Sequence, residues 1–232
     1  MTETSGGSDV SGTETVARQR GDGHWELSGR KWFTSACTSQ MALALARPEG
    51  GSRGSKGLAL FYLETQKDDA IIPQIRITRL KDKLGTRQLP TAELLLDSAP
   101  AVLIGEASGG VKSIAPMLNI TRTWNSVCAI ALLRRAVALA RDYANRRVTF
   151  GSPLAEQPLH LYTLAGAQAR LEAAFGLTFF LVERLGASEQ AQSEANDHSL
   201  VRLLTPMTKA LTAKYAVAGI SEMLEALSLI HI

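Results

Sequence analysis

The chain has 232 residues, 45% of them hydrophobic, and this length and composition predict one or two globular domains with a sizeable core. Its formal net charge of +3, from 25 basic against 22 acidic residues, is too small to indicate nucleic-acid binding by itself. Two cysteines do not make a disulfide scaffold, and no apolar run approaches the roughly 18 residues of a membrane span, so no membrane-spanning helix is expected.

The first twelve residues, Met1 to Gly12, read MTETSGGSDVSG. Three glycines among small hydroxyl and acidic residues leave backbone N–H groups free to face a ligand, which suits a phosphate or a flavin. A flexible Gly- and Ser-rich terminus is the alternative explanation of the glycines. Because this motif begins at the first residue, we expect the whole protein to have a preceding segment.

Up to about residue 103, short groups of β-forming residues alternate with turns rich in Gly, Pro, Ser and Asp. The pattern predicts an all-β domain over residues 1–107, with about six strands closed into a barrel or packed as an orthogonal sandwich to hide their edges. The expected strands are residues 25–27, 31–33, 41–46, 58–63, 71–77 and 94–96.

Helical spacing begins after Gly110 and predicts a long first helix with Leu133, Ala136, Val137, Ala140 and Ala144 on one face. A break at residues 150–153 ends this helix.

A second helix is expected from about Leu159 to Leu185, ended by Gly186. A loop over residues 187–198 should separate it from a third helix over 200–215. Three antiparallel helices predict an incomplete four-helix bundle over residues 108–227, so the fold class is α+β. Residues 228–232 follow without a helix cap, and their permitted codons can spell the end of a sequencing adaptor. We interpret them as an artefactual tail.

The segment from Gly29 to Ser35 places an indole, a phenyl ring and a hydroxyl in one expected strand. The two-residue period of a strand predicts that Trp32 and Thr34 share a face, where they can pack on and hydrogen-bond a flat aromatic ligand. A tryptophan buried in a sheet core is the alternative.

The segment from Tyr143 to Gly151, at the end of the first helix, contains Arg147. A guanidinium can hold phosphate oxygens through two hydrogen bonds and stays charged. The alternative is an arginine that only balances the negative end of the helix dipole.

These three motifs, in this order, resemble the acyl-CoA dehydrogenase family, which has a Gly-Ser-Asp flavin loop, a G-x-K-x-W-I-T strand and a Y-A-x-x-R-x-x-F-G helix end. The turn from Leu84 to Arg87 is similar to the family's L-G-x-R turn. The resemblance covers roughly residues 1–227 and is nearest to the AidB-like branch. It implies that the sequence lacks an N-terminal helical domain and the C-terminal end.

The resemblance implies FAD as the cofactor, with Trp32 packed beside the flavin, Thr34 bonded to the ring edge and Arg147 reaching the pyrophosphate of a neighbouring subunit's FAD. The family's common glutamine falls on Pro158, with Gln157 one place earlier. The residues implied to bind the cofactor are Met1, Thr2, Gly7, Ser8, Trp32, Phe33, Thr34, Arg147, Phe150 and Gln157.

The resemblance also implies an acyl-CoA substrate, whose CoA part would contact Ser8, Ser55, Asn119 and Arg122. The implied reaction removes an α proton and transfers a hydride from the β carbon to the flavin. Thr121 stands where some members carry the catalytic glutamate, and a hydroxyl cannot serve as the α-proton base. We therefore assign no catalytic residue within this sequence.

The implied partners are a second copy of the chain, in a dimer or tetramer, and an electron-acceptor flavoprotein. The four histidines are scattered, so no metal site is predicted. Two alternatives remain open. One is a flavoprotein that acts mainly by binding and protecting nucleic acid, and the other is a flavin oxidase or monooxygenase of the same superfamily.

Overall fold

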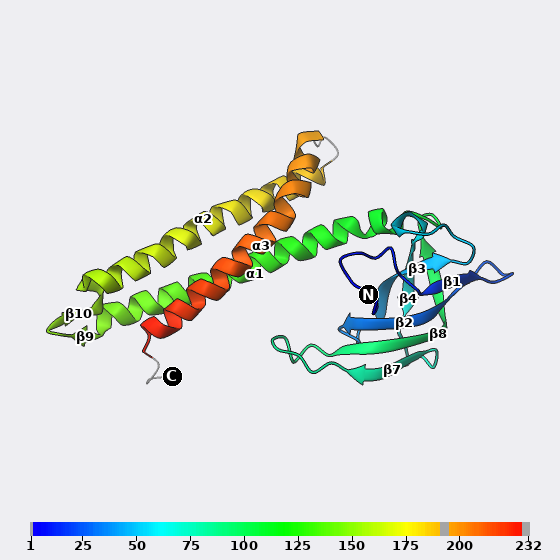
Figure 1. The fold of residues 1–232 in the computed structure, drawn as a ribbon, viewed down its shortest axis with the longest axis horizontal. Helices are drawn as coiled ribbons and strands as arrows, with labels where there is room; N and C mark the ends of the chain where they lie inside the picture. The colour runs from blue at the N-terminus through cyan, green and yellow to red at the C-terminus, as the bar shows by residue number, and fades with distance from the viewer. Residues whose placement is uncertain (1, 191–194, 229–232) are drawn as a thin grey trace. The chain divides into compact units, whose positions relative to one another are not determined.

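The computed structural model describes residues 2–190 and 195–228, and the chain divides into two compact units, Met1–Pro116 and Met117–Ile232 (Figure 1). Met1, one of the predicted cofactor contacts, and residues 229–232 of the predicted tail lie outside the described residues. The division at residue 107 stays a prediction.

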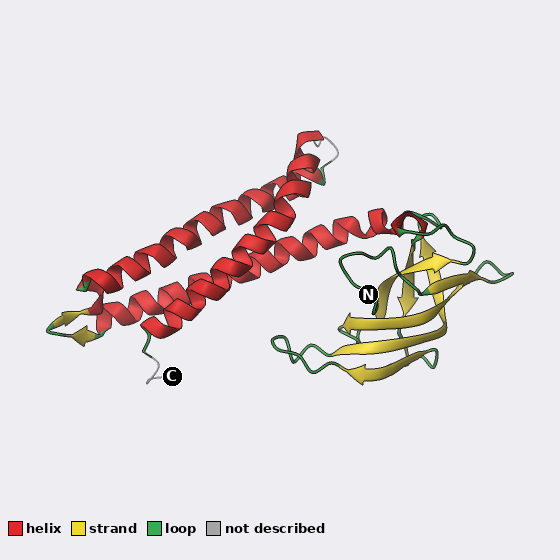
Figure 2. Cartoon of the chain, in the orientation of Figure 1, coloured by secondary structure: helices red, strands yellow, loops and turns green. Residues whose placement is uncertain are grey.

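The first unit is a closed β barrel (Figure 2). The sheet order is β2-β1-β3-β4-β8-β7, and β2 also pairs with β8, which closes the ring. The strands of this sheet are β1 Val16–Gln19, β2 Trp25–Ser35, β3 Met41–Pro48, β4 Ala59–Glu64, β7 Ile75–Leu80 and β8 Thr91–Ile104. The 3-10 turn η1 spans Ser55–Gly57, and a small hairpin pairs β5 Gln66–Lys67 with β6 Ala70–Ile71.

The barrel is filled by side chains that alternate along the strands, among them Ala17, Leu27, Phe61, Leu63 and Leu96. The indole of Trp25 packs on Phe61 with ring centroids 5.4 Å apart. This interior confirms the predicted barrel, because alternate residues of each strand point to one common core.

Three strand predictions need correction. The groups at 25–27 and 31–33 belong to one strand, β2, because Gly29 lies inside the strand and does not end it. Strand β1 was missed because its sequence VARQ carries only one buried apolar side chain. The group at 71–77 is divided between β6 and β7 by a turn at Pro73, which cannot donate a ladder hydrogen bond.

The second unit contains the antiparallel helices α2, Pro158–Ser188, and α3, Ala195–Ala226, and most of α1, Gly110–Arg146, whose first turns belong to the first unit (Figure 1). A short hairpin of β9, Val148–Thr149, and β10, Ser152–Pro153, reverses the chain after α1 and is followed by the turn η2, Leu154–Glu156. The predicted run of three helices after the β domain is confirmed.

The predicted face of α1 packs inward, with Leu133, Val137, Ala140 and Ala144 all buried against α2 and α3. A Cβ added to Gly219 of α3 would lie 2.6 Å from a Leu133 methyl carbon, so the helices approach closely there. No helix in the described ranges is both long and apolar enough to cross a membrane.

The loop predicted over residues 187–198 is wrong at both ends. Helix α2 continues past Gly186 to Ser188, whose hydroxyl donates to the Leu185 carbonyl oxygen at 2.7 Å. Helix α3 already includes Asp197, which suits the positive end of the helix dipole and pairs with Arg184 at 3.0 Å.

Candidate functional site

The N-terminal loop is attached to β2 through the backbone. The Thr2 carbonyl oxygen accepts hydrogen bonds from the N–H groups of Trp32, at 2.7 Å, and Phe33, at 3.4 Å. A Cβ at Gly7 would lie only 3.0 Å from the Thr2 side chain, so glycine allows the loop to fold back on itself. These contacts bring Thr2 beside Trp32 and Phe33 and Gly7 beside Thr2, and their shared role in a flavin site stays a prediction.

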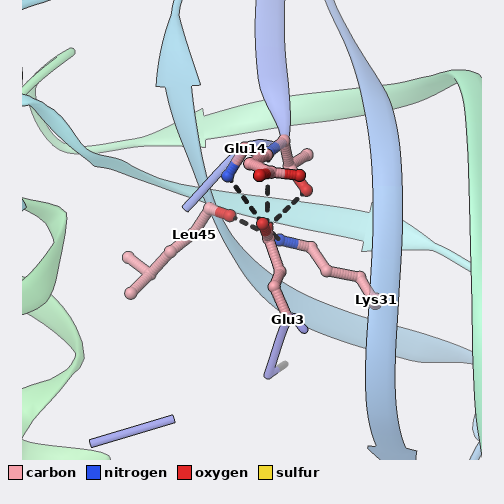
Figure 3. A network of polar contacts seen from close by, with 5 residues as sticks. Glu3, Glu14, Lys31 and Leu45 are labelled. Atoms are coloured by element: carbon pink, nitrogen blue, oxygen red, sulfur yellow. Dashed lines mark hydrogen bonds and ion pairs between the residues drawn. The ribbon is translucent and has the colours of Figure 1, made fainter. Parts of the chain in front are cut away.

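A buried ion pair between Glu3 and Lys31 also attaches this loop to β2. The Lys31 ammonium donates to Oε1 of Glu3 at 2.6 Å and to the Leu45 carbonyl oxygen at 2.8 Å (Figure 3). The same carboxylate accepts a hydrogen bond from the Thr15 hydroxyl at 2.6 Å and one from the Glu14 N–H at 2.6 Å. Glu3 is 5% exposed and Lys31 is completely buried. Both charges are therefore paired and hydrogen-bonded, as buried charges must be.

The two charges of this pair perturb each other. Burial alone would raise the pKa of the Glu3 carboxyl, but the Lys31 charge and the hydrogen bonds from Lys31, Thr15 and Glu14 together hold that pKa below its ordinary value. Burial lowers the pKa of the Lys31 ammonium, although Glu3 opposes this shift. Glu3 is consequently a carboxylate at neutral pH.

Gly29 makes room for the pair. A Cβ at this position would lie 2.6 Å from the Thr15 hydroxyl oxygen and 2.7 Å from the Thr15 Cα. Any larger residue would push β1 and its preceding segment away and break the hydrogen bond from Thr15 to Glu3. The glycine of the segment Gly29 to Ser35 is therefore explained by packing.

The predicted sharing of one face by Trp32 and Thr34 is wrong. The pairing of β2 with β8 shifts register between Lys31 and Thr34, which is a β-bulge. The extra residue turns both Trp32 and Phe33 outward, where they are 37% and 44% exposed, and it turns Lys31 and Thr34 inward. The aromatic rings and the Thr34 hydroxyl are still neighbours along the strand. The rings, however, are exposed at the surface of this unit, whereas the hydroxyl is buried.

The Thr34 hydroxyl is buried, and it finds no hydrogen-bond partner among the described residues. Such a group is costly unless something else satisfies it. The Lys81 ammonium lies 3.4 Å from the centroid of the Trp32 ring and 2.8 Å from Oε1 of Glu93. Lys81 thus occupies one side of the indole.

Two residues predicted to bind CoA, Ser8 and Ser55, are exposed in the first unit. Ser8 belongs to the N-terminal loop, and Ser55 opens the turn η1. Within the described residues neither hydroxyl makes a hydrogen bond, which leaves each of them accessible to a ligand.

The other two predicted CoA contacts, Asn119 and Arg122, are half-buried on α1 and are three residues apart, so they lie on neighbouring positions of one helix surface. Thr121 is exposed, and its hydroxyl donates to the Leu118 carbonyl oxygen at 3.0 Å. That local bond is typical of a helical threonine and gives Thr121 no basic character.

The remaining predicted cofactor contacts gather at the end of the second unit. Arg147 is exposed directly after α1, and its carbonyl oxygen accepts the Leu154 N–H at 2.8 Å. Gln157 donates to the Thr149 carbonyl oxygen at 3.3 Å and to the Ser152 hydroxyl at 2.8 Å, which holds the β9–β10 hairpin closed. Phe150 is fully exposed with φ of 51°, a left-handed backbone that costs energy for a bulky residue.

Comparison with known proteins decides the family. The model of the acyl-CoA dehydrogenase middle domain matches residues 1–99, and that of the C-terminal domain matches residues 108–229. The chain belongs to the acyl-CoA dehydrogenase family. Enzymes of this family are FAD-dependent flavoproteins.

Relatives of the predicted branch are among the matches. Acyl-CoA dehydrogenase family member 11 of Caenorhabditis elegans is 44% identical over 97% of this chain and 37% of its own length. The putative acyl-CoA dehydrogenase AidB of Escherichia coli is 34% identical over 98% of this chain and 40% of its own length. A crystal structure of the C. elegans protein ACDH-11 in complex with C11-CoA superimposes with a TM-score of 0.92, covering 99% of this chain and 40% of that one. The chain thus spans about two fifths of the curated relatives it matches.

The residues present fit FAD, the cofactor of the acyl-CoA dehydrogenase family. The observation that favours this cofactor is the Gly-rich N-terminal loop, hydrogen-bonded to β2 beside two outward aromatic rings. Glu3, Lys31 and Lys81 were not predicted from the sequence. The signal for two of them was a charged residue inside a motif, since Glu3 lies in the segment Met1 to Gly12 and Lys31 in the segment Gly29 to Ser35. No group of three His, Cys, Asp or Glu side chains in the described part of the chain is placed to hold a metal ion.

Proposed function

We propose that the protein is an FAD-dependent oxidoreductase that introduces an α,β double bond into an acyl-CoA thioester. The observation that carries this proposal is the attachment of the Gly-rich N-terminal loop to β2 beside the exposed rings of Trp32 and Phe33. The Thr34 hydroxyl is one of six buried polar side-chain atoms without a partner in the described residues, and a hydrogen bond to the polar edge of a bound flavin would satisfy it. A flavin has a flat ring to lie near Trp32 and Phe33 and a polar edge for Thr34.

The first unit would bind and orient the flavin. The Thr2 carbonyl oxygen and the Glu3 carboxylate are both committed to β2, so the free N–H groups of the loop around Gly7 and Ser8 are held in a fixed place beside the exposed rings. Backbone N–H groups of such a Gly-rich loop suit flavin oxygens or phosphate. FAD, when bound, supplies the acceptor for the hydride that leaves the substrate.

The substrate proposal rests on four side chains and one relative. Ser8, Ser55, Asn119 and Arg122 offer hydroxyl, amide and guanidinium groups that suit the amides and phosphates of CoA. The C. elegans relative, 42% identical in its solved structure, binds C11-CoA. We propose an acyl-CoA as the substrate of this protein also, and the base that removes the α proton is not Thr121.

Arg147, Phe150 and Gln157 are proposed to bind FAD held by a second copy of the chain. Their support is that Arg147 is exposed and forms no ion pair with any residue in the described ranges, unlike its neighbour Arg146, which pairs with Asp142. A homodimer or homotetramer follows from this proposal, because the cofactor would otherwise lose its contacts with the hairpin end.

The experiment is to purify the protein in a longer form extended at both ends, measure bound FAD by absorbance, and add acyl-CoAs of increasing chain length without oxygen. Bleaching of the flavin by an acyl-CoA, with electrons passed on to a dye, is the expected result. A protein that stays colourless after incubation with FAD would contradict the proposal. Reoxidation by oxygen instead of dye would favour the oxidase alternative, and salt-dependent DNA binding without flavin reduction would favour the nucleic-acid alternative. Transfer to an electron-acceptor flavoprotein can be tested with the same reduced enzyme.

A further inference from the structure

Arg47, near the end of β3, joins two loops that carry different parts of the proposed site. Its guanidinium donates to the Ser11 carbonyl oxygen at 2.9 Å, to the Gly54 carbonyl oxygen at 3.0 Å and to the Ser52 carbonyl oxygen. Ser11 belongs to the N-terminal loop, whereas Ser52 and Gly54 belong to the loop that leads into η1. One side chain therefore spans both segments.

The contacts of Arg47 differ from those of other arginines in the same unit. In the described part of the chain its guanidinium bonds only to backbone carbonyl oxygens, while Arg18 pairs with the Glu49 carboxylate at 2.9 Å on the exposed surface. A planar guanidinium can direct several N–H groups at fixed angles, so it can hold two backbone segments at once. Its role here is geometric and does not involve a carboxylate partner.

Each of the two loops is also held by a hydrogen bond that does not involve Arg47. In the N-terminal loop, the Asp9 carboxylate accepts the Ser11 N–H at 2.8 Å, which closes the turn that follows Ser8. In the second loop, the Lys56 carbonyl oxygen accepts the Gly109 N–H at 2.9 Å. Arg47 thus connects two segments that are already folded, and its loss would free their positions relative to each other.

We infer that Arg47 is a positioning residue that holds Ser8 and Ser55 at the separation needed to bind the CoA part of the substrate. This inference rests on the proposed function, because it takes both serines as CoA contacts. Arg47 acts through the Ser11 carbonyl oxygen, three residues after Ser8, and the Gly54 carbonyl oxygen, one residue before Ser55. The flavin contacts of Thr2, Trp32 and Thr34 depend on the separate Glu3–Lys31 pair and should survive its removal.

The test compares wild type with Arg47→Met, Arg47→Lys and the control Arg18→Met, all in the FAD-loaded protein in its longer form extended at both ends. Free CoA and butanoyl-CoA are titrated by calorimetry, KM and kcat are measured separately, and amide hydrogen exchange is followed in residues 5–12 and 50–57. For Arg47→Met we expect about tenfold weaker CoA binding and a similar rise in KM, with kcat and the flavin absorbance unchanged. Exchange should become faster in both loops together. Arg47→Lys should give a CoA affinity and a KM between those of wild type and Arg47→Met, since lysine keeps the positive charge but lacks the planar guanidinium with several N–H groups.

Equal CoA affinity in wild type and Arg47→Met, or faster exchange in one loop only, would overturn the inference while leaving the proposed function intact. A melting temperature that falls with no change in CoA affinity would show a purely structural role and would also overturn it. Wild-type protein that binds FAD but neither CoA nor butanoyl-CoA would refute the proposed substrate, and this inference with it. Arg18→Met should match wild type throughout, because exposed ion pairs contribute little.

Discussion

The Nζ atom of Lys31 lies 2.6 Å from Oε1 of Glu3, and both side chains are shielded from solvent. The pair joins the N-terminal loop to the middle of the barrel across 28 residues of sequence. Because the Thr2 carbonyl oxygen, next to Glu3, accepts the N–H groups of Trp32 and Phe33, the pair also sets where the exposed rings lie relative to the loop.

Removing one partner of this pair should destabilise the protein strongly. Lys31→Met leaves the Glu3 carboxylate buried without its counter-charge, and we expect the free energy of unfolding in urea to fall by about 3–5 kcal/mol. The double variant Lys31→Met, Glu3→Gln should recover part of this loss. As a control, Arg18→Met breaks an exposed pair and should cost less than about 1 kcal/mol. A Lys31→Met protein as stable as this control would contradict the argument.

The contribution of Glu3 should depend on pH in a defined direction. Its folded-state pKa lies below the ordinary glutamate value of about 4.3, so its stabilising effect is complete above that value and is lost as pH falls through the folded pKa. The difference in unfolding free energy between wild type and Glu3→Gln should be largest near neutral pH and shrink under acid conditions. Urea unfolding from pH 7 to pH 3 measures it. A difference that grows on acidification would show that the pKa is raised instead.

Thr34→Val should weaken FAD binding without destabilising the apoprotein. Without FAD, the valine removes a buried hydroxyl that has no partner, so the unfolding free energy should not fall. With FAD, the loss of one hydrogen bond should weaken binding by about 1 kcal/mol and shift the flavin absorbance. Ser35→Ala, at the neighbouring hydroxyl that bonds to Thr91, is the control and should leave the flavin spectrum alone. Unchanged FAD affinity in Thr34→Val would make Thr34 an ordinary strand residue.

Arg147→Ala should lower FAD retention and the mass of the oligomer together, because the proposed contact crosses between copies. Arg146→Ala is the matched control, since Arg146 is also exposed but is engaged with Asp142 on its own helix. Arg147→Lys should retain only part of the FAD affinity, because a lysine cannot make the paired hydrogen bonds of a guanidinium. If FAD affinity and oligomer mass are intact in both Arg147 variants, the helix-dipole explanation is preferred.

The 232-residue chain expressed as written should show no acyl-CoA dehydrogenase turnover. Thr121 occupies the position that the family resemblance gives to a base, and its hydroxyl is already bonded to the Leu118 carbonyl oxygen. Loss of general-base catalysis alone costs on the order of 100-fold to 10,000-fold in rate. Flavin reduction is assayed beside a longer form extended at both ends. Comparable reduction by the two forms would show that the base lies within these residues.

Local patterns in the sequence were enough to predict the order of the two structural classes and the family. Alternating β-forming groups followed by helical spacing predicted the barrel and the three helices, because strand and helix periods are properties of neighbouring residues. The flavin loop, the Trp32 segment and the Arg147 helix end were recognisable for the same reason, since each motif is a short continuous run.

Only the tertiary structure decided how these runs meet. The bulge that turns Trp32 and Phe33 outward depends on the register between β2 and β8, which pair at Ser35 and Thr91. These two residues are 56 positions apart, and local propensity cannot pair them. Likewise, the contacts of Glu3 with Lys31, and of Arg47 with Ser11 and Gly54, exist only in the closed barrel. The sequence by itself determined which chemical groups are available, and the closure of the barrel decided which of them are buried, paired or left free for a ligand.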